Sequence, residues 1–188
     1  MLPFSARRGK GQGSWKRAGA RTPFFFVQLP IYGKQSENND ASSWATLHDA
    51  QLAALDLGEW NDIHPINKKD VGHRLALAVE KALHKSENTA PGPLLRNVER
   101  KQGQLLLHFD NCGDGLVASA PPHVTVITYG MHLRLPAAIE GPDCISVDIS
   151  SSGKPEKIFY AWANNPRDQQ LHNSDGLPVI PFRAQIKW

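Results

Sequence analysis

Residues 104–110, Gln-Leu-Leu-Leu-His-Phe-Asp, place Leu105, Leu107 and Phe109 on one side of an extended chain. This period of two is the pattern of a β-strand with one face in a core. The same period returns at Val124 and Val126 and at Ile145, Val147 and Ile149, and an apolar run follows at 158–162. Turn-forming residues separate these segments at 111–115, 140–143, 152–155 and 164–166. Several short strands at this spacing predict an antiparallel β-sandwich over residues 93–188.

The pattern before residue 92 is helical. Asn67, with Asp70 three residues later, resembles a capping box, which marks a helix start. Apolar residues then define one helical face at Val71, Leu75, Ala78, Val79 and Leu83. The stretch Pro91-Gly92-Pro93 has the composition of a linker, so we place a domain boundary near residue 92.

Two further elements are predicted closer to the N-terminus. Residues 24–29, Phe-Phe-Phe-Val-Gln-Leu, form a continuous apolar run typical of a strand that is buried on both faces. Residues 44–55 have helical spacing behind a capping serine, and residues 56–66 form the loop between the two helices. Residues 23–90 therefore read as α/β, and the predicted fold class of the chain is α/β followed by all-β.

Charge is distributed unevenly along the chain. Residues 1–22 carry six Lys and Arg residues and no acid, while the other 166 residues hold fifteen basic and eighteen acidic residues. The basic tail has no apolar core typical of a signal peptide, and we predict that it is disordered. It also lacks the aromatic interleaving of a single-strand binder, so nucleic-acid binding is not predicted. The longest apolar run, residues 23–27, is too short for a membrane span.

The two cysteines and eight histidines do not indicate a metal or cofactor site. Cys112 and Cys144 can pair in an oxidising compartment, but they read as small buried hydrophobic residues. The sequence has no CxxC motif or Cys/His cluster at zinc-ligand spacing. We therefore predict no metal and no cofactor.

The loop 56–66 holds the candidate catalytic group, His64. A histidine can take a proton from a serine when a carboxylate or carbonyl orients its other nitrogen, and Asp62 is a candidate for that role. Trp60, next to these residues, is a candidate substrate contact, because an aromatic face binds the apolar face of a sugar ring. The alternative interpretation of His64 is a loop residue that only packs against its neighbours or caps a helix. The alternative interpretation of Asp62 is a solvated loop carboxylate.

Asp56 and Glu59 raise a further alternative, because with Asp62 and His64 they can be assembled into a site for a hard cation. Carboxylates beside Lys68 and Lys69 are more often ion pairs. A nucleophile at Ser14 is not supported, because Ser14 lies in the basic tail without a strand-to-helix elbow.

Residues 61–72, Asn-Asp-Ile-His-Pro-Ile-Asn-Lys-Lys-Asp-Val-Gly, resemble the stretch around the catalytic histidine of sialate O-acetylesterases, members of the SGNH (GDSL-like) hydrolase superfamily. Five other stretches are similar to this family in the same order along the chain: 23–30, 44–51, 109–116, 160–166 and 176–183. The resemblance implies a flavodoxin-like α/β domain, present here as its last strand and helices, followed by a β-domain. It also implies a serine esterase that removes O-acetyl groups from sialic acids or other acetylated sugars, with His64 as the base.

Three departures from this family limit the resemblance. The block that carries the nucleophilic serine and those that form the oxyanion hole have no counterpart here. A strand expected between Leu55 and Asp56 is absent, and the Asp-x-x-His spacing of the superfamily would place the acid at Asn61. The imidazole of His64 is therefore oriented by Asp62, by a backbone carbonyl or by neither.

These observations predict a C-terminal fragment of a sialate O-acetylesterase that is inactive alone and that needs an N-terminal half to supply the serine. Without the upstream strands, the edge of strand 24–29 is left uncovered, and we expect poor solubility, low order before residue 92 or association with another chain. Members of the resembled family are often periplasmic, secreted or lysosomal, but no signal peptide is recognised and the sequence does not assign a compartment. The alternative is a non-catalytic β-sandwich that binds a partner or a carbohydrate.

Overall fold

The computed structural model describes residues 67–84, 87, 92–164, 166 and 169–188. The predicted tail, the strand at 24–29 and the helix at 44–55 lie outside the described residues. The described part holds one helix, α2 (Lys68–His84), and the following strands: β1 (Leu94–Lys101), β2 (Gln104–Asp110), β3 (Leu116–Ala118), β4 (His123–Thr128), β5 (Met131–Gly141), β6 (Cys144–Asp148), β7 (Lys157–Tyr160), β8 (Leu171–Asn173) and β9 (Phe182–Gln185). Helix α2 does not have the length and apolar character that crossing a membrane requires.

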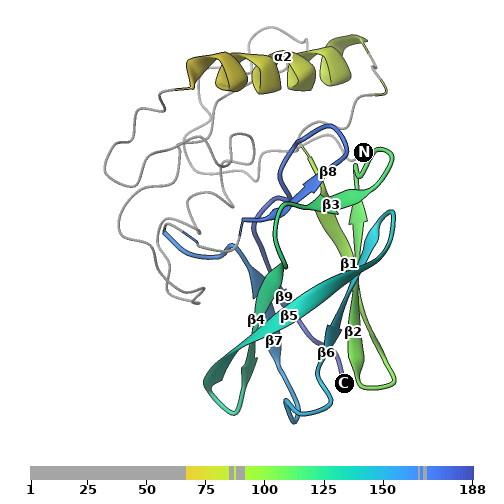
Figure 1. The fold of residues 1–188 in the computed structure, drawn as a ribbon, viewed down its shortest axis with the longest axis vertical. Coiled ribbons are helices and arrows are strands. Elements are labelled where there is room, and N and C mark those ends of the chain that lie inside the picture. Colours follow the sequence, from red (N-terminus) through yellow and green to blue (C-terminus); the bar gives the residue numbers. More distant parts are fainter. Residues whose placement is uncertain (1–66, 85–86, 88–91, 165, 167–168) are drawn as a thin grey trace, which may run out of the picture.

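Seven of these strands form one antiparallel sheet in the order β1-β2-β6-β5-β4-β7-β9, and β3 pairs with β8 in a separate ribbon. The long strand β5 belongs to both halves of the sheet. Its first half pairs with β4 up to Pro136, and its second half, from Ala137, pairs with β6. A strand that passes from one layer to the next is a recognised way of making the corner between two layers. The predicted β-rich antiparallel fold is confirmed, but its two layers are halves of one curled, nearly closed sheet (Figure 1).

The two edge strands of the sheet come together, which explains why it is nearly closed. The Ile180 N–H, just before β9, donates to the Pro93 carbonyl, just before β1, at 3.0 Å. At the other end of β1, the Arg100 guanidinium lies 4.5 Å from the centre of the Trp188 ring, a cation–π contact. These contacts join residues that are far apart in the sequence, and they bring the first and last strands of the sheet together. We call residues 92–188 the β-domain.

Gly92 occupies a position in this closure that only glycine fits. Its φ of +115° lies in the region that L side chains avoid, and a Cβ added to it would lie 2.6 Å from the Pro178 carbonyl oxygen. Gly92 and Pro93 are both buried. These two residues, which have the composition of a linker, therefore pack into the β-domain. The domain boundary near residue 92 stays a prediction.

The alternating residues of the opening sequence pattern form the core. Leu105 and Leu107 are completely buried and Phe109 is 1% exposed, while the residues between them are only half-buried. Strands β4 and β6, with the residue just after β6, contribute the partners that the same period predicts: Val124, Val126, Ile145, Val147 and Ile149. Burying each such side chain contributes about 1.5–3 kcal/mol relative to leaving it in water.

Strand β7 is buried on both faces, in agreement with its uninterrupted apolar run. Ile158 and Tyr160 belong to the main core, whereas Phe159 joins Trp162 and Ile127 in a second cluster. Successive side chains of a strand point to opposite faces, so this second cluster lies on the outer face of the sheet.

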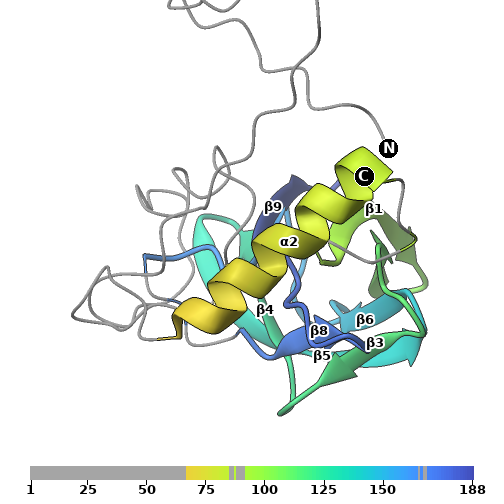
Figure 2. The ribbon, with the colours of Figure 1, turned by 90° about the horizontal axis from the view of Figure 1, so that it is seen from above.

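The predicted cap of helix α2 is present. The Asn67 Oδ1 accepts the Asp70 N–H at 3.2 Å, and the Asn67 Nδ2 donates to the Asp70 carboxylate at 2.6 Å. This is a variant of the capping box in which the second bond joins the two side chains. The predicted apolar face of α2 is only half-buried, and Leu83 is 51% exposed. Figures 1 and 2 show α2 lying across the end of the β-domain at which β3 and β8 sit.

Candidate functional site

His64, Asp62 and Trp60, the predicted site residues, lie outside the described residues. Their roles and mutual geometry stay predictions. The described structure begins at Asn67, three residues after His64, where the cap fixes the start of α2. Helix α2, which follows the predicted loop 56–66, is therefore described from its cap onward.

The other end of α2 meets the β-domain at Asn111, in the turn between β2 and β3. The Lys81 Nζ donates to the Asn111 Oδ1 at 3.0 Å. The Asn111 Nδ2 donates to the Gly92 carbonyl at 3.3 Å, and the Asn111 carbonyl accepts from the Asn173 Nδ2 at 3.1 Å. We call these contacts the Asn111 junction. They join the helix to two segments of the β-domain that are far apart in sequence.

The two cysteines are free thiols whose surroundings disfavour the thiolate. Burial, with the carboxylates of Asp143 and Asp110 as lesser causes, raises the pKa of Cys112 to about 11. Burial also raises the pKa of Cys144. Because the thiolate is the reactive form, the raised pKa makes each thiol less reactive near neutral pH. The prediction that Cys112 is a small buried hydrophobic residue is confirmed by its place in the core.

Several serine hydroxyls in the described part of the chain have structural partners. The Ser146 hydroxyl donates to the Glu140 carboxylate at 2.5 Å, and the Ser119 hydroxyl donates to the Gln170 carbonyl at 3.3 Å. Within the described ranges, no group of three metal-ligating side chains comes together.

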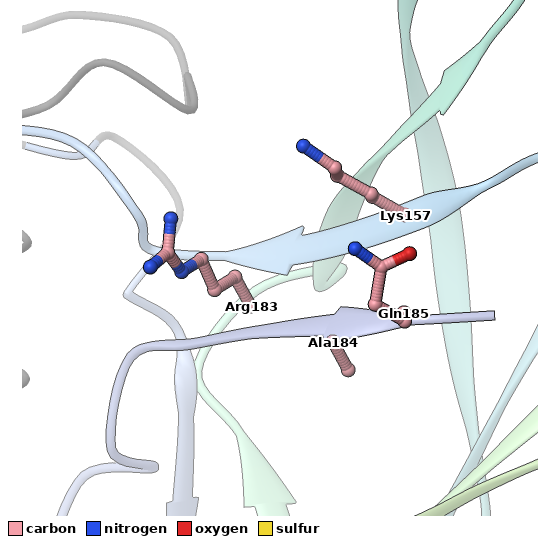
Figure 3. Close-up of a pocket in the computed structure, with 4 residues that line it drawn as sticks. All are labelled: Lys157, Arg183, Ala184 and Gln185. Atoms are coloured by element: carbon pink, nitrogen blue, oxygen red, sulfur yellow. The ribbon is translucent and has the colours of Figure 1, made fainter.

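An open hollow of about 300 Å³ lies on the sheet surface beside β7 and β9, lined by Lys157, Arg183, Ala184 and Gln185 (Figure 3). Lys157 and Gln185 are opposite each other in the β7–β9 register, and Arg183 lies two residues before Gln185 in β9, on the same face. The Arg183 guanidinium lies 5.1 Å from the centre of the Trp162 ring, which holds its plane against an aromatic surface. Two cations and an amide thus face the same open space.

The hollow was not anticipated from the sequence. Its residues come from two strands that are 22 positions or more apart along the chain, and the register that pairs them is a long-range feature. The alternation of apolar and polar residues in β9, Phe-Arg-Ala-Gln, is the one local signal that places Arg183 and Gln185 on the same face.

Comparison with known proteins identifies a similarity to one class of enzyme, the carbohydrate acetylesterases. One matching solved structure is XAC1771, a carbohydrate acetylesterase from Xanthomonas citri, with 31% sequence identity and a TM-score of 0.73. The match covers 86% of this chain and 40% of XAC1771, so the chain spans well under half of that protein. No protein-family profile and no curated protein matches the chain. The similarity supports a relation to carbohydrate esterases.

Proposed function

We propose that this chain is part of an enzyme that hydrolyses acetyl esters of sugars, with O-acetylated sialic acids as the first substrate class to test. The similarity to XAC1771, a carbohydrate acetylesterase, carries the proposal. The sequence resemblance around His64 points to the same chemistry. The proposal includes the expectation that the serine is supplied by protein outside residues 1–188 and that the chain is inactive alone.

Each residue has a defined role in the proposed reaction. The serine oxygen attacks the acetyl carbonyl while His64 takes its proton, and His64 then gives that proton to the departing sugar oxygen. Water, activated by the same histidine, releases acetate from the acyl-enzyme and regenerates the serine. Asp62 is the proposed orienting group for His64, and Trp60 contacts the sugar ring.

The test measures acetate release from O-acetylated sialic acid and from p-nitrophenyl acetate, together with labelling by a fluorophosphonate. Two proteins are compared: the chain alone, and a chimera in which this chain replaces the matched 40% of XAC1771. We expect no label and no turnover for the chain alone, and both for the chimera. A labelled serine in the chain alone would place the nucleophile within residues 1–188. An inactive but folded chimera would contradict the proposal.

The hollow beside β7 and β9 favours a second candidate function, binding of acidic carbohydrate without turnover. Arg183 and Lys157 supply positive charge for a carboxylate, and Gln185 supplies an amide for a hydroxyl. Isothermal titration with N-acetylneuraminic acid and with a neutral sugar tests this function. We expect the acidic sugar alone to bind, and Arg183→Ala to weaken it by about tenfold or more, since a hydrogen bond to a charged group contributes about 1.5–3 kcal/mol.

Lys101→Ala, at the exposed last residue of β1, is the matched control for a lost surface charge. Equal weakening by Lys101→Ala would indicate a general charge effect and not a site. Equal binding of the neutral sugar would remove the assigned role of the two cations.

A further inference from the structure

We propose that Asn111 is a positioning residue that fastens the last turns of α2 to the β-domain and so sets the direction in which the helix presents the loop bearing His64. The coupling of α2 to the β-domain through Asn111 rests on described contacts. Its effect on catalysis rests on the proposed function.

Asn111 uses all of its polar side-chain atoms and its carbonyl in this role. Its Oδ1 accepts from Lys81 at 3.0 Å, its Nδ2 donates to the Gly92 carbonyl at 3.3 Å, and its carbonyl accepts from Asn173 at 3.1 Å. Three segments therefore meet at one residue: α2 and the entry to β1 at its side chain, and the end of β8 at its carbonyl. An asparagine also suits its backbone, because its φ of 62° is left-handed and asparagine tolerates this region better than most residues.

The β-domain side of the junction is rigidly held. Asn173 is completely buried, and its Oδ1 accepts the N–H groups of Asp175 at 3.1 Å and Leu177 at 2.9 Å. Gly92 is buried too, and it has no space for a side chain beside Pro178. Because Asn173 is held by other hydrogen bonds and Gly92 is packed against Pro178, Asn111 has little freedom to follow α2 if the helix moves.

The helix side of the junction depends on Lys81. This side chain is half-buried, and burial lowers the pKa of its ammonium, while Glu87 acts in the opposite direction. An ammonium that has lost part of its hydration gains more from the Asn111 oxygen than a fully solvated one. Lys81 also lies near the C-terminal end of α2, where a positive charge interacts favourably with the helix dipole.

Because α2 is long, a small change of tilt at Lys81 moves its N-terminal end by a large distance. Asn67 and Lys81 are fourteen residues apart, so they are separated by about 21 Å along the helix axis. A tilt of about 10° at Lys81 would move the Asn67 end by roughly 4 Å over that length. Catalytic groups tolerate much less, since a misplacement of about 1 Å can cost about 100-fold in rate. A junction at one end of the helix can therefore decide whether a base at the other end meets its serine.

The test uses the full chain and measures amide hydrogen exchange in α2 relative to β2. Lys81→Met removes the charge and keeps the length of the side chain. Asn111→Gly removes the side chain and keeps the left-handed backbone. We expect each variant to speed exchange in α2 by about tenfold or more, because a hydrogen bond to a charged group is lost, and to leave β2 unchanged. Lys69→Met, in the exposed first turn of the same helix, is the control and should have no effect.

Asn111→Asp tests the link more specifically, because it keeps an acceptor for Lys81 while losing the donor to Gly92. We expect exchange in α2 close to that of the wild type in this variant, and loss of this protection when Lys81→Met is added. Unchanged exchange in Lys81→Met and Asn111→Gly, or an equal increase in Lys69→Met, would overturn the coupling.

The effect of Asn111 on catalysis is measured as kcat and KM in the XAC1771 chimera. Asn111→Gly should lower kcat and kcat/KM together with little change in KM, and Asn111→Asp should restore them. A fall in kcat that Asn111→Asp does not restore would overturn the positioning role. A wild-type chimera without turnover would contradict the proposed function and leave the exchange result to decide the coupling.

Discussion

His64→Ala is expected to lower acetate release by the XAC1771 chimera by a factor of about 10²–10⁴, the range that a positioned general base contributes. Without the imidazole, the serine proton must leave to water, and the departing sugar oxygen must be protonated by water as well. Both chemical steps of the proposed reaction therefore slow. The effect should appear mainly in kcat, because the side chain acts on the reacting atoms and not on sugar binding.

His73→Ala is the matched control for this prediction. It removes the same side chain from the exposed surface of α2 and should leave turnover unchanged. Wild-type turnover in His64→Ala would show that another group is the base. A comparison with Asp62→Asn then decides the orienting group, because a carboxylate that holds the imidazole should cost turnover when it is lost. If Asp62→Asn leaves turnover unchanged, a backbone carbonyl orients the imidazole of His64, or no group does.

Phe109→Ala is expected to lower the free energy of unfolding by about 3–5 kcal/mol, the usual cost of truncating a buried aromatic residue. Phe109 is 1% exposed, and its ring packs on that of Phe182 with centroids 5.9 Å apart. Phe109 is in β2 and Phe182 is in β9, so the side chain fills the space where the two ends of the curled sheet approach each other. Its loss leaves a cavity at that closure, and the surrounding strands can collapse into it only in part.

Urea unfolding followed by tryptophan fluorescence measures this effect, with Val117→Ala as the control. Val117 in β3 is 42% exposed, and its truncation should cost less than about 1 kcal/mol. A loss of less than about 1.5 kcal/mol in Phe109→Ala, with an unchanged dependence on urea, would contradict the described packing of the core.

The elements that depend on local patterns were predictable from the sequence. The alternation at 104–110 places the core side of β2 correctly, and the pair Asn67 and Asp70 marks the start of α2. Both signals depend on residues a few positions apart, and local geometry decides them. The candidate base, His64, came from its acidic neighbours and from a family resemblance, and the described structure does not reach it.

The arrangement of these elements depended on contacts between distant residues. The apolar spacing indicates strands, but the number and position of the layers follow from β5, which pairs with β4 at one end and with β6 at the other. The hollow beside β7 and β9 depends on a register between segments that are far apart along the chain. A period of two does not specify which strands become neighbours, because it constrains only the face of each side chain.

The sequence by itself determined the β-rich character of residues 93–188, the start of α2 and the chemistry to look for around His64. Only the tertiary structure decided that the sheet curls on itself, that Gly92 packs into it and that Asn111 joins α2 to the β-domain. The physical reason is the range of the interactions. Caps and alternation are set by neighbours along the chain, whereas closure and junctions form between residues that only folding brings together.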